Sequence, residues 1–570
     1  MSDESPTLFS GSAAATERLD KHSGKTVARA LRNHGTDTVF TLCGGHVLPI
    51  LDGCLDENIR VIDARHEQGA VLMAEGYAYA SRSAGVAAIT AGPGFTNAVT
   101  GIADANHSGV PVVVLGGRTP LRSWNRDAIQ DIDQLAIAKV ICKRATTCLA
   151  PERVAEYVAD AFWHATSARC GAAYVELPTD VLLSEPDEPA FQPGYPSAVA
   201  EVVAAPEAVA ELVGVLSAAE RPVVICGSGP FWGRADAALA RFAEVTGIPV
   251  TTTGPSRGLL PDSHPGCLGS LVHGGVAVAL ADVVVVCGSR FDGNLLFGGP
   301  PLFGAQKLVQ IDVRREAFGG NRAPDLAIAG DAARVLEQVA GAWDKPPHTE
   351  WLAAARQMAD ASRDAWGAES DANADGVHPG FLAREVNAAA HASGDCTVVC
   401  DGGDILTWGI AHCTAEQPAG ILTTGTALGT LGVGLPFAIG AKAARPRDTV
   451  VCLVGDGSLG LQAMELDTAA RHGLPVVVVV SNNGAWADVV HEQQAWFGDD
   501  RLVASELRFT AYEKLAEMVG GFAATVTTPD EVRPALDAAI ASGKTAVVNV
   551  RTDPRVVSEI LRGIGQLGVM

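Results

Sequence analysis

Short runs of valine, isoleucine and alanine, each ended by a glycine or asparagine turn, recur along the chain. In "TVVCLVGDGS" and "LPVVVVVSNN" the apolar run is nearly continuous, which is typical of a strand buried on both faces of a parallel sheet. Stretches with helical spacing of apolar residues separate the runs. Neighbouring parallel strands need a crossover of this kind. The repeated pattern therefore predicts α/β domains with parallel sheets.

Three blocks of this pattern follow one another in the 570 residues. They cover residues 22–188, 204–345 and 379–555, and a short tail, 556–570, follows. Each block has the size of one doubly wound domain. The glycine turns then lie at the carboxyl ends of the strands, where such sheets bind ligands. We predict three doubly wound parallel-sheet domains in series.

Composition argues against several classes of protein. The formal net charge of −23 disfavours nucleic acid as a partner. No stretch approaches the roughly 18 apolar residues of a membrane span, and the chain starts with polar residues, so we expect no membrane association. The twelve cysteines include no CxxC pair, and several lie in apolar runs. Reduced thiols of this kind favour a cytoplasmic protein.

A carboxylate and an amide side chain follow two of the runs in the third block. Asp456 lies between Gly455 and Gly457, and 24 residues (458–481) separate Gly457 from a pair of asparagines that ends with Asn483. Two adjacent strand ends would bring Asp456 and Asn483 together. Their oxygens suit Mg²⁺, and the glycines let the backbone approach a diphosphate at a helix N-terminus. The pattern predicts a site for a metal-bound diphosphate.

The spacing of these residues resembles the diphosphate-binding motif of thiamine-diphosphate enzymes. "TAGPGFTNAVTGIADANHSGVPVVVLGG" and "TTGTALGTLGVGLPFAIGAK" extend the resemblance to the acetolactate-synthase-like group over nearly the whole chain. It implies the domain order pyrimidine, middle, diphosphate, with thiamine diphosphate and Mg²⁺ as cofactors. Because the pyrimidine domain of one subunit faces the diphosphate domain of another in that group, it also implies a homodimer at least and usually a homotetramer.

The resemblance assigns roles to residues of the third block. The metal ligands would be Asp456, Asn483 and the carbonyl group of Ala485. The diphosphate would be contacted by Ser458 and by the turn of Gly402 and Gly403, beside Gly455 and Gly457.

The first block supplies a second carboxylate for the same cofactor. In "RHEQG", Glu67 follows a predicted strand and opens a predicted helix. The resemblance implies that Glu67 contacts the aminopyrimidine and drives the acid–base relay that removes the C2 proton. Backbone groups of Gly429 and Leu431 would contact the same ring, and Leu431 would also bend the cofactor.

Three further residues narrow the choice among the reactions that thiamine-diphosphate enzymes catalyse. His46 follows the strand-like "DTVFTLCGG", a layout that resembles benzaldehyde lyase and the 2-hydroxyacyl-CoA lyases, and it would hold a substrate oxygen or move a proton. Gln130 matches a family segment in which a glutamine faces the cofactor from the neighbouring subunit. Glu492, in "GAWADVVHEQQAW", is expected on one helical face with Ala485 and Asp488, in a helix that begins at Ala485 and lies over the thiazolium.

The His-Glu-Gln triplet around Glu492 resembles the 2-hydroxyacyl-CoA lyases. One carboxylate there could take the hydroxyl proton of the substrate and return a proton to the product. We therefore predict a lyase that reversibly cleaves a 2-hydroxyacyl-CoA, such as 2-hydroxyisobutyryl-CoA, to formyl-CoA and a ketone or aldehyde. Two other functions stay open: an acetolactate-synthase-type carboligase that uses pyruvate, and a catalytically inactive scaffold. For Glu492 itself, a solvated acid on a helix surface stays the alternative.

Strand ends of the second block resemble the nucleotide-contacting segments of the same group. "VICGSGP", "CGSRFDG", "VQIDVRREAF" and "IAGDAARV" carry the candidate residues, which are Gly227, Ser289, Arg290, Asp312 and Asp331. The resemblance implies ADP, with FAD less favoured and an empty pocket as the remaining alternative. The tail has an amphipathic pattern, and we expect it to act as a lid over the acyl-CoA.

Overall fold

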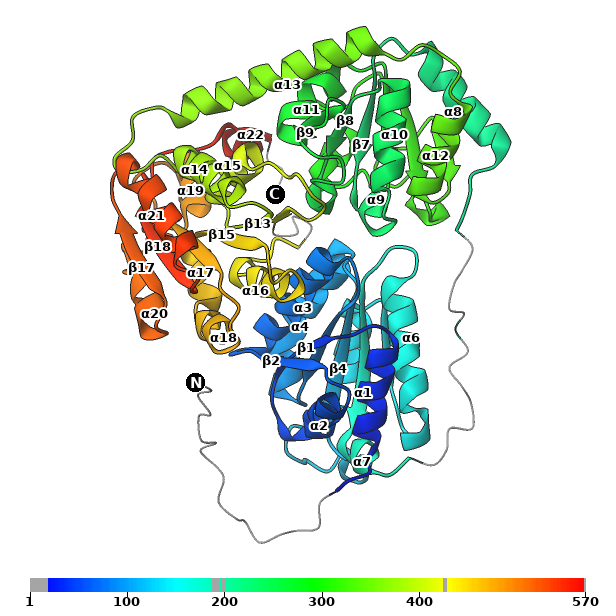
Figure 1. Cartoon of the computed structure of the whole chain (residues 1–570), viewed down its shortest axis with the longest axis vertical. Helices are drawn as coiled ribbons and strands as arrows, with labels where there is room; N and C mark the ends of the chain where they lie inside the picture. The colour runs from blue at the N-terminus through cyan, green and yellow to red at the C-terminus, as the bar shows by residue number, and fades with distance from the viewer. Residues whose placement is uncertain (1–18, 187–194, 196–200, 424–427, 568–570) are drawn as a thin grey trace.

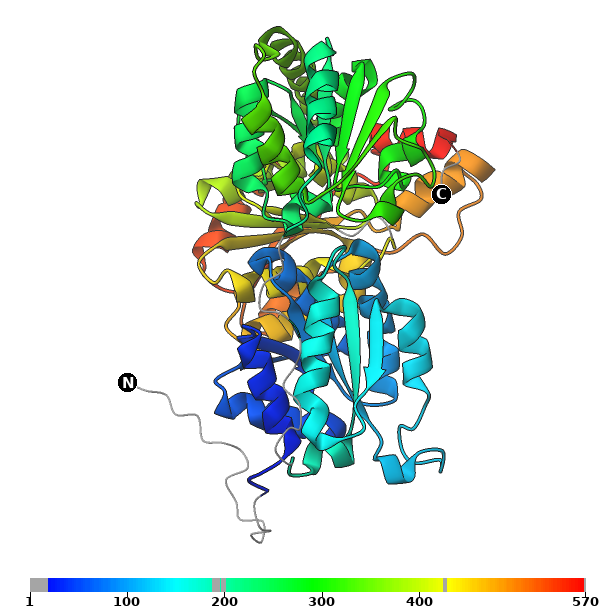
Figure 2. The same cartoon turned by 90° about the vertical axis from the view of Figure 1, so that its right-hand side faces the viewer.

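The structure is a computed structural model that describes residues 19–186, 195, 201–423 and 428–567. It contains three six-stranded sheets with helices around them, and every pairing between named strands is parallel. The predicted fold class is confirmed. Figures 1 and 2 show the first domain at the bottom, with the third and second domains above it. The exact domain boundaries stay predictions, and residues 187–188 and 568–570 lie outside the described ones.

The first sheet has the strand order β2-β1-β3-β4-β6-β5. Strands β3 and β4 are buried along their whole length, as their continuous apolar runs predict. The strands are β1 (Thr38–Leu42), β2 (Arg60–Asp63), β3 (Gly85–Ile89), β4 (Val112–Arg118), β5 (Arg144–Thr147) and β6 (Ala172–Pro178). The helices are α1 (Ser23–Asn33), α2 (Leu48–Asp56), α3 (Glu67–Ser81), α4 (Pro93–Ser108), α5 (Gln134–Ile141), α6 (Val154–Thr166) and α7 (Thr179–Leu183).

The second sheet has the order β12-β11-β10-β7-β8-β9. Counted within its own domain and from the other edge, this is the order 3-2-1-4-5-6 of dinucleotide-binding folds. The strands are β7 (Pro222–Cys226), β8 (Val250–Thr252), β9 (Cys267–Ser270), β10 (Val283–Cys287), β11 (Lys307–Asp312) and β12 (Leu326–Ala329). The helices are α8 (Pro206–Ala218), α9 (Ser228–Trp232), α10 (Asp236–Thr246), α11 (Leu271–Leu280) and α12 (Ala332–Ala342).

The third sheet, β14-β13-β15-β16-β18-β17, repeats the strand order of the first. Its strands are β13 (Cys396–Asp401), β14 (Ile421–Thr423), β15 (Thr449–Gly455), β16 (Val477–Asn482), β17 (Phe522–Val526) and β18 (Ala546–Arg551). The helices are α14 (Pro379–Ala392), α15 (Asp404–His412), α16 (Gly434–Ala444), α17 (Asp456–Gln462), α18 (Glu465–Arg471), α19 (Ala487–Phe497), α20 (Glu513–Met518), α21 (Pro529–Ala541) and α22 (Glu559–Leu567). Within the described ranges, no helix combines the length and the apolar character that crossing a membrane requires.

The first and third domains share one hydrophobic core. Helix α3 packs on α16 near the centre of Figure 1, and glycines allow the close approach. A Cβ on Gly76 would lie 2.5 Å from the Phe437 Cα, and one on Gly440 would lie 2.0 Å from the Met73 carbonyl oxygen. The backbones therefore touch, and the two domains form one packed unit.

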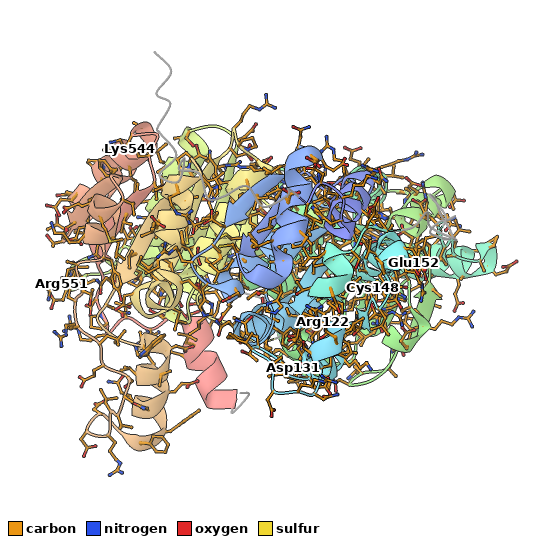
Figure 3. All side chains as sticks on the ribbon, turned by 90° about the horizontal axis from the view of Figure 1, so that it is seen from below. Arg122, Asp131, Cys148, Glu152, Lys544 and Arg551 are labelled. Atoms are coloured by element: carbon orange, nitrogen blue, oxygen red, sulfur yellow. The ribbon has the colours of Figure 1, made fainter. Side chains whose placement is uncertain are left out.

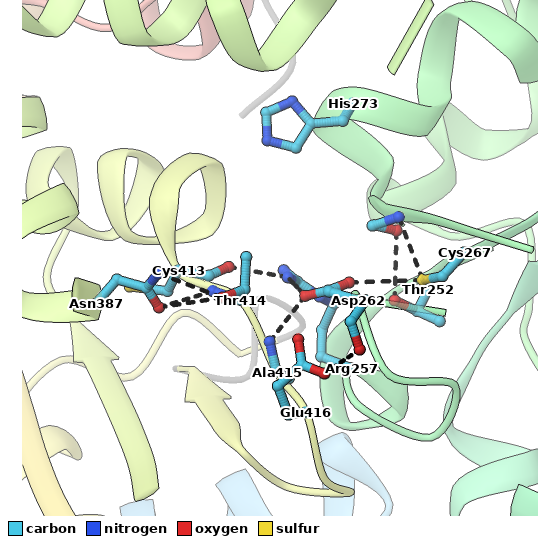
Figure 4. A network of polar contacts seen from close by, with 12 residues as sticks. Thr252, Arg257, Asp262, Cys267, His273, Asn387, Cys413, Thr414, Ala415 and Glu416 are labelled. Atoms are coloured by element: carbon cyan, nitrogen blue, oxygen red, sulfur yellow. Dashed lines mark hydrogen bonds and ion pairs between the residues drawn. The ribbon is translucent and has the colours of Figure 1, made fainter. Parts of the chain in front are cut away.

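A buried ion pair joins the second and third domains. Arg257 Nη2 donates to Asp262 Oδ2 at 2.7 Å and to the Cys413 carbonyl oxygen at 2.9 Å, while the Ala415 N–H donates to Asp262 Oδ2 at 2.8 Å. Figure 4 shows this network between the two domains. Both charges have buried partners, which a buried ion pair needs in order to be tolerated. The helix α13 (Thr349–Ser370) also bridges these domains, along the top of Figure 1.

Candidate active site

The third sheet reverses its strand order between β13 and β15, which are paired. Doubly wound sheets bind ligands in the crevice at such a switch point. The turn of Gly402 and Gly403 follows β13, and Asp456 follows β15. The next strand, β16, ends at Asn482. The residues predicted to bind the diphosphate and metal therefore lie at neighbouring strand ends around the switch point.

Asp456 and Asn483 both accept hydrogen bonds from the turn that follows β16. The Gly484 N–H donates to Asp456 Oδ2 at 3.1 Å, and the Ala485 N–H donates to Asn483 Oδ1 at 3.2 Å. Burial raises the pKa of Asp456 to about 7. A cation would favour its ionised form. Helix α17 begins at Asp456 itself, so this residue lies at a helix N-terminus as predicted for the diphosphate site.

Glycines keep the backbone close to this switch point. Gly402 has a φ of 129°, and a Cβ there would lie 3.4 Å from the Gly455 nitrogen. A Cβ on Gly457 would lie 2.6 Å from the Trp486 ring. Two side-chain oxygens and the Ala485 carbonyl leave coordination positions for phosphate oxygens and water, as Mg²⁺ prefers. These donors and this backbone fit a magnesium-bound diphosphate.

The loop with Gly429 and Leu431 is tied to the first domain. Thr430, between them, donates from Oγ1 to Asp104 Oδ1 on α4 at 2.7 Å. Gly429 has a φ of 69°, and Leu431 is half-buried. The Gly434 N–H, just after the loop, donates to Asp401 Oδ2 at 2.9 Å. The loop is thus tied to α4 of the first domain at Thr430 and to the end of β13 in the third domain at Gly434.

Polar side chains gather at the switch point of the first sheet, between β1 and β3. His46 Nδ1 lies 3.1 Å from Thr90 Oγ1, and burial lowers the pKa of His46, which favours the neutral ring. A Cβ on Gly94 would lie 2.6 Å from Thr90 Cγ2 and 3.3 Å from Glu67 Oε1. Glu67 opens α3, and its Oε2 accepts from Asn97 Nδ2 at 2.9 Å. His46 and Glu67 therefore flank the turn after β3.

Gln130 borders the same turn. A Cβ on Gly92 would lie 2.7 Å from the Gln130 Cβ, and Gln130 itself is half-buried with a φ of 63°. The buried Gln134 supports the turn, because its Oε1 accepts from the Gly92 N–H at 3.1 Å. The structure thus brings His46, Glu67 and Gln130 to one turn.

Helix α19 carries Asp488 and Glu492 one turn apart. A Cβ on Gly403 would lie 2.6 Å from Asp488 Oδ2, so Asp488 packs against the turn after β13. Burial raises the pKa of the half-buried Glu492, and Asp488 raises it further. The charges of Asp488 and Glu492 therefore interact across one turn of α19.

The start of α19 corrects the prediction. The sequence predicts a helix that begins at Ala485, but α19 begins at Ala487. Ala485 forms an isolated bridge with Glu506, and the Trp486 N–H donates to the Ser505 carbonyl oxygen at 2.8 Å. This pairing holds the chain out of the helical conformation before Ala487, and Trp486 accordingly has φ −77° and ψ 72°. Ala485 therefore lies outside the helical face that carries the two acids.

A third acid, Asp404, adjoins Asp488. It is buried at the first turn of α15, and among the described residues its Oδ1 has no hydrogen-bond partner. Burial and the charge of Asp488 raise its pKa to about 7. Burial also raises the pKa of Asp488, and His491 partly offsets this. Neighbouring carboxyl groups of this kind hold protons near neutral pH.

The second domain borders a cavity of about 550 Å³ that residues of the other two domains also line. Its sheet reverses order between β7 and β10, and Gly227 follows β7. A Cβ on Gly227 would lie 2.5 Å from the Ser289 Cβ, so the two turns touch. The other predicted nucleotide-binding residues line the cavity: Ser289, Arg290, Asp312 and Asp331. Asp331 Oδ1 also caps α12 by accepting from the Arg334 N–H at 3.2 Å.

Five arginines line this cavity, and three of them lie near one another. Arg169 comes from the first domain, and Arg290 and Arg314 come from the second. Burial, followed by the charges of Arg290 and Arg314, lowers the pKa of Arg169 to about 10. Like charges held this close favour an anionic ligand. The sequence does not single out Arg169 or Arg314.

Comparison with known proteins finds one family along the chain. The domains described as "Thiamine pyrophosphate enzyme, N-terminal TPP binding domain", "central domain" and "C-terminal TPP binding domain" match residues 21–137, 209–339 and 401–550. The chain belongs to the thiamine pyrophosphate enzyme family. The predicted cofactor, thiamine diphosphate, agrees with this membership.

Relatives of this thiamine pyrophosphate enzyme carry two kinds of name. The acetolactate synthase large subunit of Mycobacterium tuberculosis is 39% identical over 94% of this chain and 96% of its own. The 2-hydroxyacyl-CoA lyase 2 of Homo sapiens is 33% identical over 94% and 91%. The acetolactate synthase isozyme 2 large subunit of Escherichia coli is 30% identical over 92% and 95%. The predicted lyase- and synthase-like group is thereby confirmed, without a choice between the two reactions.

The two groups of predicted residues belong to different domains of this enzyme, because Glu67 opens α3 in the first domain and Asp456 opens α17 in the third. No hydrogen bond or ion pair among the described residues joins Glu67 to Asp456 or Asn483. No motif of the sequence singles out Thr90 or Asn97, which bond His46 and Glu67. Both are polar residues in the segment that follows β3. Their position just after a strand that ends at the switch point could have marked them as candidates.

Proposed function

We propose that this enzyme is a 2-hydroxyacyl-CoA lyase that forms formyl-CoA and a ketone or aldehyde, with 2-hydroxyisobutyryl-CoA as an example of its substrate. The observation that carries the proposal is the position of Glu492. It is a half-buried acid one helical turn from Asp488, which packs on the Gly403 turn. Its raised pKa lets it hold a proton more readily than a free glutamate does, which suits a group that must accept and return one.

The overall reaction moves one proton. The bond between the thioester carbonyl carbon and the hydroxyl-bearing carbon breaks, the hydroxyl group becomes a carbonyl group, and the formyl carbon gains a hydrogen. Ionised Glu492 accepts the hydroxyl proton and later returns it to the formyl carbon, so atoms and charges balance. Thiamine diphosphate, when bound, supplies a nucleophilic carbon and an electron sink.

Other residues would hold the cofactor and the substrate. Asp456, Asn483 and the Ala485 carbonyl would bind Mg²⁺, and Glu67, fixed by Asn97, would hold a proton at the aminopyrimidine. These roles use donors that the fold already orients, which limits the cost of binding.

His46 and Gln130 would orient the substrate. With His46 Nδ1 beside Thr90, the Nε2 atom is left to bond a substrate oxygen. The amide of Gln130 can donate or accept without a change of charge.

The test is a direct assay with thiamine diphosphate and Mg²⁺. 2-Hydroxyisobutyryl-CoA and pyruvate are supplied separately, and formyl-CoA plus acetone is measured against acetolactate. We expect formyl-CoA from the wild type and about 10²- to 10⁴-fold less from Glu492→Gln, the range for a lost general acid–base group. Asp499→Asn, which removes an exposed acid just beyond α19, is the control. Full activity of Glu492→Gln would contradict the proton-transfer role.

The synthase-named relative at 39% identity favours a second candidate, an acetolactate-synthase-type carboligase. In the same assay it would give acetolactate from pyruvate and leave the CoA ester intact. That result would support the proposed cofactor site and would replace the lyase reaction with a carboligase reaction.

For the cavity of the second domain we propose ADP as the ligand, with FAD as the alternative. The three arginines and the dinucleotide-type strand order support a nucleotide diphosphate. The purified protein is heat-denatured and the released nucleotides are separated by chromatography. ADP without visible absorbance supports the proposal, whereas a yellow protein that releases FAD contradicts it.

We further propose that the catalytic unit is a homodimer, usually assembled as a homotetramer. Large apolar side chains are exposed beside the two predicted halves of the site: Ile129, Leu428, Leu461 and Met464. Exposed apolar surface of this kind marks protein interfaces. Light scattering after gel filtration should give the mass of a dimer or tetramer, and a catalytically active monomer would contradict the proposal.

The tail would cover a bound acyl-CoA. Helix α22 packs on α15 and α19, and Ser558 just before it bonds Thr407 (Figure 1). Addition of acyl-CoA should slow tryptic cleavage after the exposed Arg562. No change in the cleavage rate would count against the lid.

A further inference from the structure

Arg118 lies at the carboxyl end of β4 in a nearly closed environment. Arg118 is 7% exposed. Its Nη2 donates to Asp131 Oδ1 at 2.8 Å, and its Nη1 lies 3.5 Å from Glu176 Oε1. The guanidinium also lies over the Trp124 ring, 5.0 Å from its centroid. Arg118 is therefore a fixed cation between two acids and an aromatic ring, none of which the proposed chemistry uses.

These contacts reach into the loop 119–133. Asp131 bonds Arg118 with one oxygen and accepts from the Asn125 N–H with the other, at 2.9 Å. Trp124 Nε1 donates back to the Thr119 carbonyl oxygen at 2.7 Å. Much of the loop is exposed, so it buries little apolar surface to offset the entropy of ordering it. The contacts of Arg118 hold the second half of the loop, and the Leu121 N–H, which donates to Asp180 Oδ1 at 3.0 Å, holds its start.

Gln130 sits in this loop, next to Asp131. Its φ of 63° is unfavourable for a residue with a side chain, and it persists only if neighbouring contacts impose it. On one side Gln130 packs against Gly92, and on the other the chain is held by the Arg118–Asp131 pair. Strain held between two fixed points is typical of a functional position.

We propose that Arg118, through Asp131, is the positioning residue that holds Gln130 at the turn after β3. The inference rests on the proposed function, because it gives Gln130 a role in turnover. A planar, bidentate cation suits this place better than lysine, since Arg118 must meet Asp131, Glu176 and a ring face together. Figure 3 labels Asp131 and Arg122, which belong to this loop, on the same side of the first domain.

The test combines two readouts on the full-length enzyme with its cofactors. The variants are Asp131→Asn, Arg118→Lys, Gln130→Ala and the double variant with Asp131→Asn and Gln130→Ala. We expect Asp131→Asn and Gln130→Ala each to lower kcat by about 10- to 100-fold, the scale of a misplaced active-site group. The double variant should lose no more than Gln130→Ala alone, because both changes remove one interaction. Arg118→Lys should lower kcat about as much as Asp131→Asn, because an ammonium group cannot contact Asp131, Glu176 and the ring face together.

The second readout does not depend on activity. Arg122 and Arg126 are exposed in the loop, so trypsin should cut there several-fold faster in Asp131→Asn and Arg118→Lys, and at the wild-type rate in Gln130→Ala. Arg144→Ala is the control, since it removes the Arg144–Asp160 pair of the same domain away from the loop. It should change neither kcat nor cleavage in the loop.

Two results would overturn the inference: additive losses in the double variant, or unchanged tryptic rates in Asp131→Asn and Arg118→Lys. An inactive wild type on both substrates would instead overturn the proposed function, and the tryptic rates would still decide whether Arg118 holds the loop.

Discussion

Asp488 packs directly on Gly403, where an added Cβ would lie 2.6 Å from the Asp488 carboxylate. The contact joins the first turn of α19 to the turn after β13. The acid-bearing helix is therefore fixed against the backbone that is predicted to contact the diphosphate. A change at either residue should affect both cofactor binding and the placement of Glu492.

Gly403→Ala tests this contact. The new methyl group would push Asp488 away, so we expect thiamine diphosphate affinity to fall about tenfold or more, as for an overpacked site that costs about 1–3 kcal/mol. Titration calorimetry with Mg²⁺ present measures the affinity. Gly367→Ala in α13, where a Cβ meets nothing within 4 Å, is the matched control and should bind normally. Equal affinities would show that the turn tolerates a side chain.

Glu492 should set the acid limb of the pH–rate profile. Its pKa is raised by burial and by Asp488, so it becomes ionised at a higher pH than a free glutamate, whose pKa is about 4.3. We expect kcat to fall as the pH drops through this raised value. Asp488→Asn should move the limb to lower pH, because one of the two causes is removed. A limb at the same pH in that variant would contradict the assignment.

Asp404 should make the apoenzyme less stable as the pH rises. Its pKa is about 7 in the folded chain, above the value of about 3.9 in an unfolded one. The stabilisation from its protonated form is therefore complete below about pH 4 and lost as the pH rises through about 7. Asp404→Asn should match the wild type at pH 4 and exceed it by about 2–4 kcal/mol at pH 8. Chemical denaturation at both pH values measures the free energy of unfolding. Equal stability of Asp404→Asn and the wild type at pH 8 would contradict the raised pKa of Asp404.

Thr90→Val removes the partner of His46 Nδ1 with little change in volume. The ring is then free to change its tautomer and orientation, so we expect kcat/KM to fall about 10-fold while the melting temperature changes little. Thr100→Val, at an exposed position of α4, is the control. If both variants behaved alike, the contact between Thr90 and His46 would have no part in catalysis.

Much of the fold was predictable because its signals are local. The continuous valine runs of β15 and β16 predict parallel strands, and the glycines and asparagines that end them predict where ligands bind. The start of α19 was not predictable, because Ala485 pairs with the distant Glu506. Arg169 enters the cavity of another domain, and no local pattern around it points there. Contacts between distant segments decide such features.

The described strand ends that carry predicted site residues all lie at the carboxyl edges of their sheets, so none of these residues lies at the opposite edges. The turn between α21 and β18 lies on such an opposite edge, and Gly543 there has open space around it. Lys544 is exposed, and Figure 3 shows it at the upper left, well apart from Asp131. A fluorescent protein or affinity tag inserted after Gly543 should leave turnover intact, which makes this turn a practical handle for attaching the enzyme to a surface.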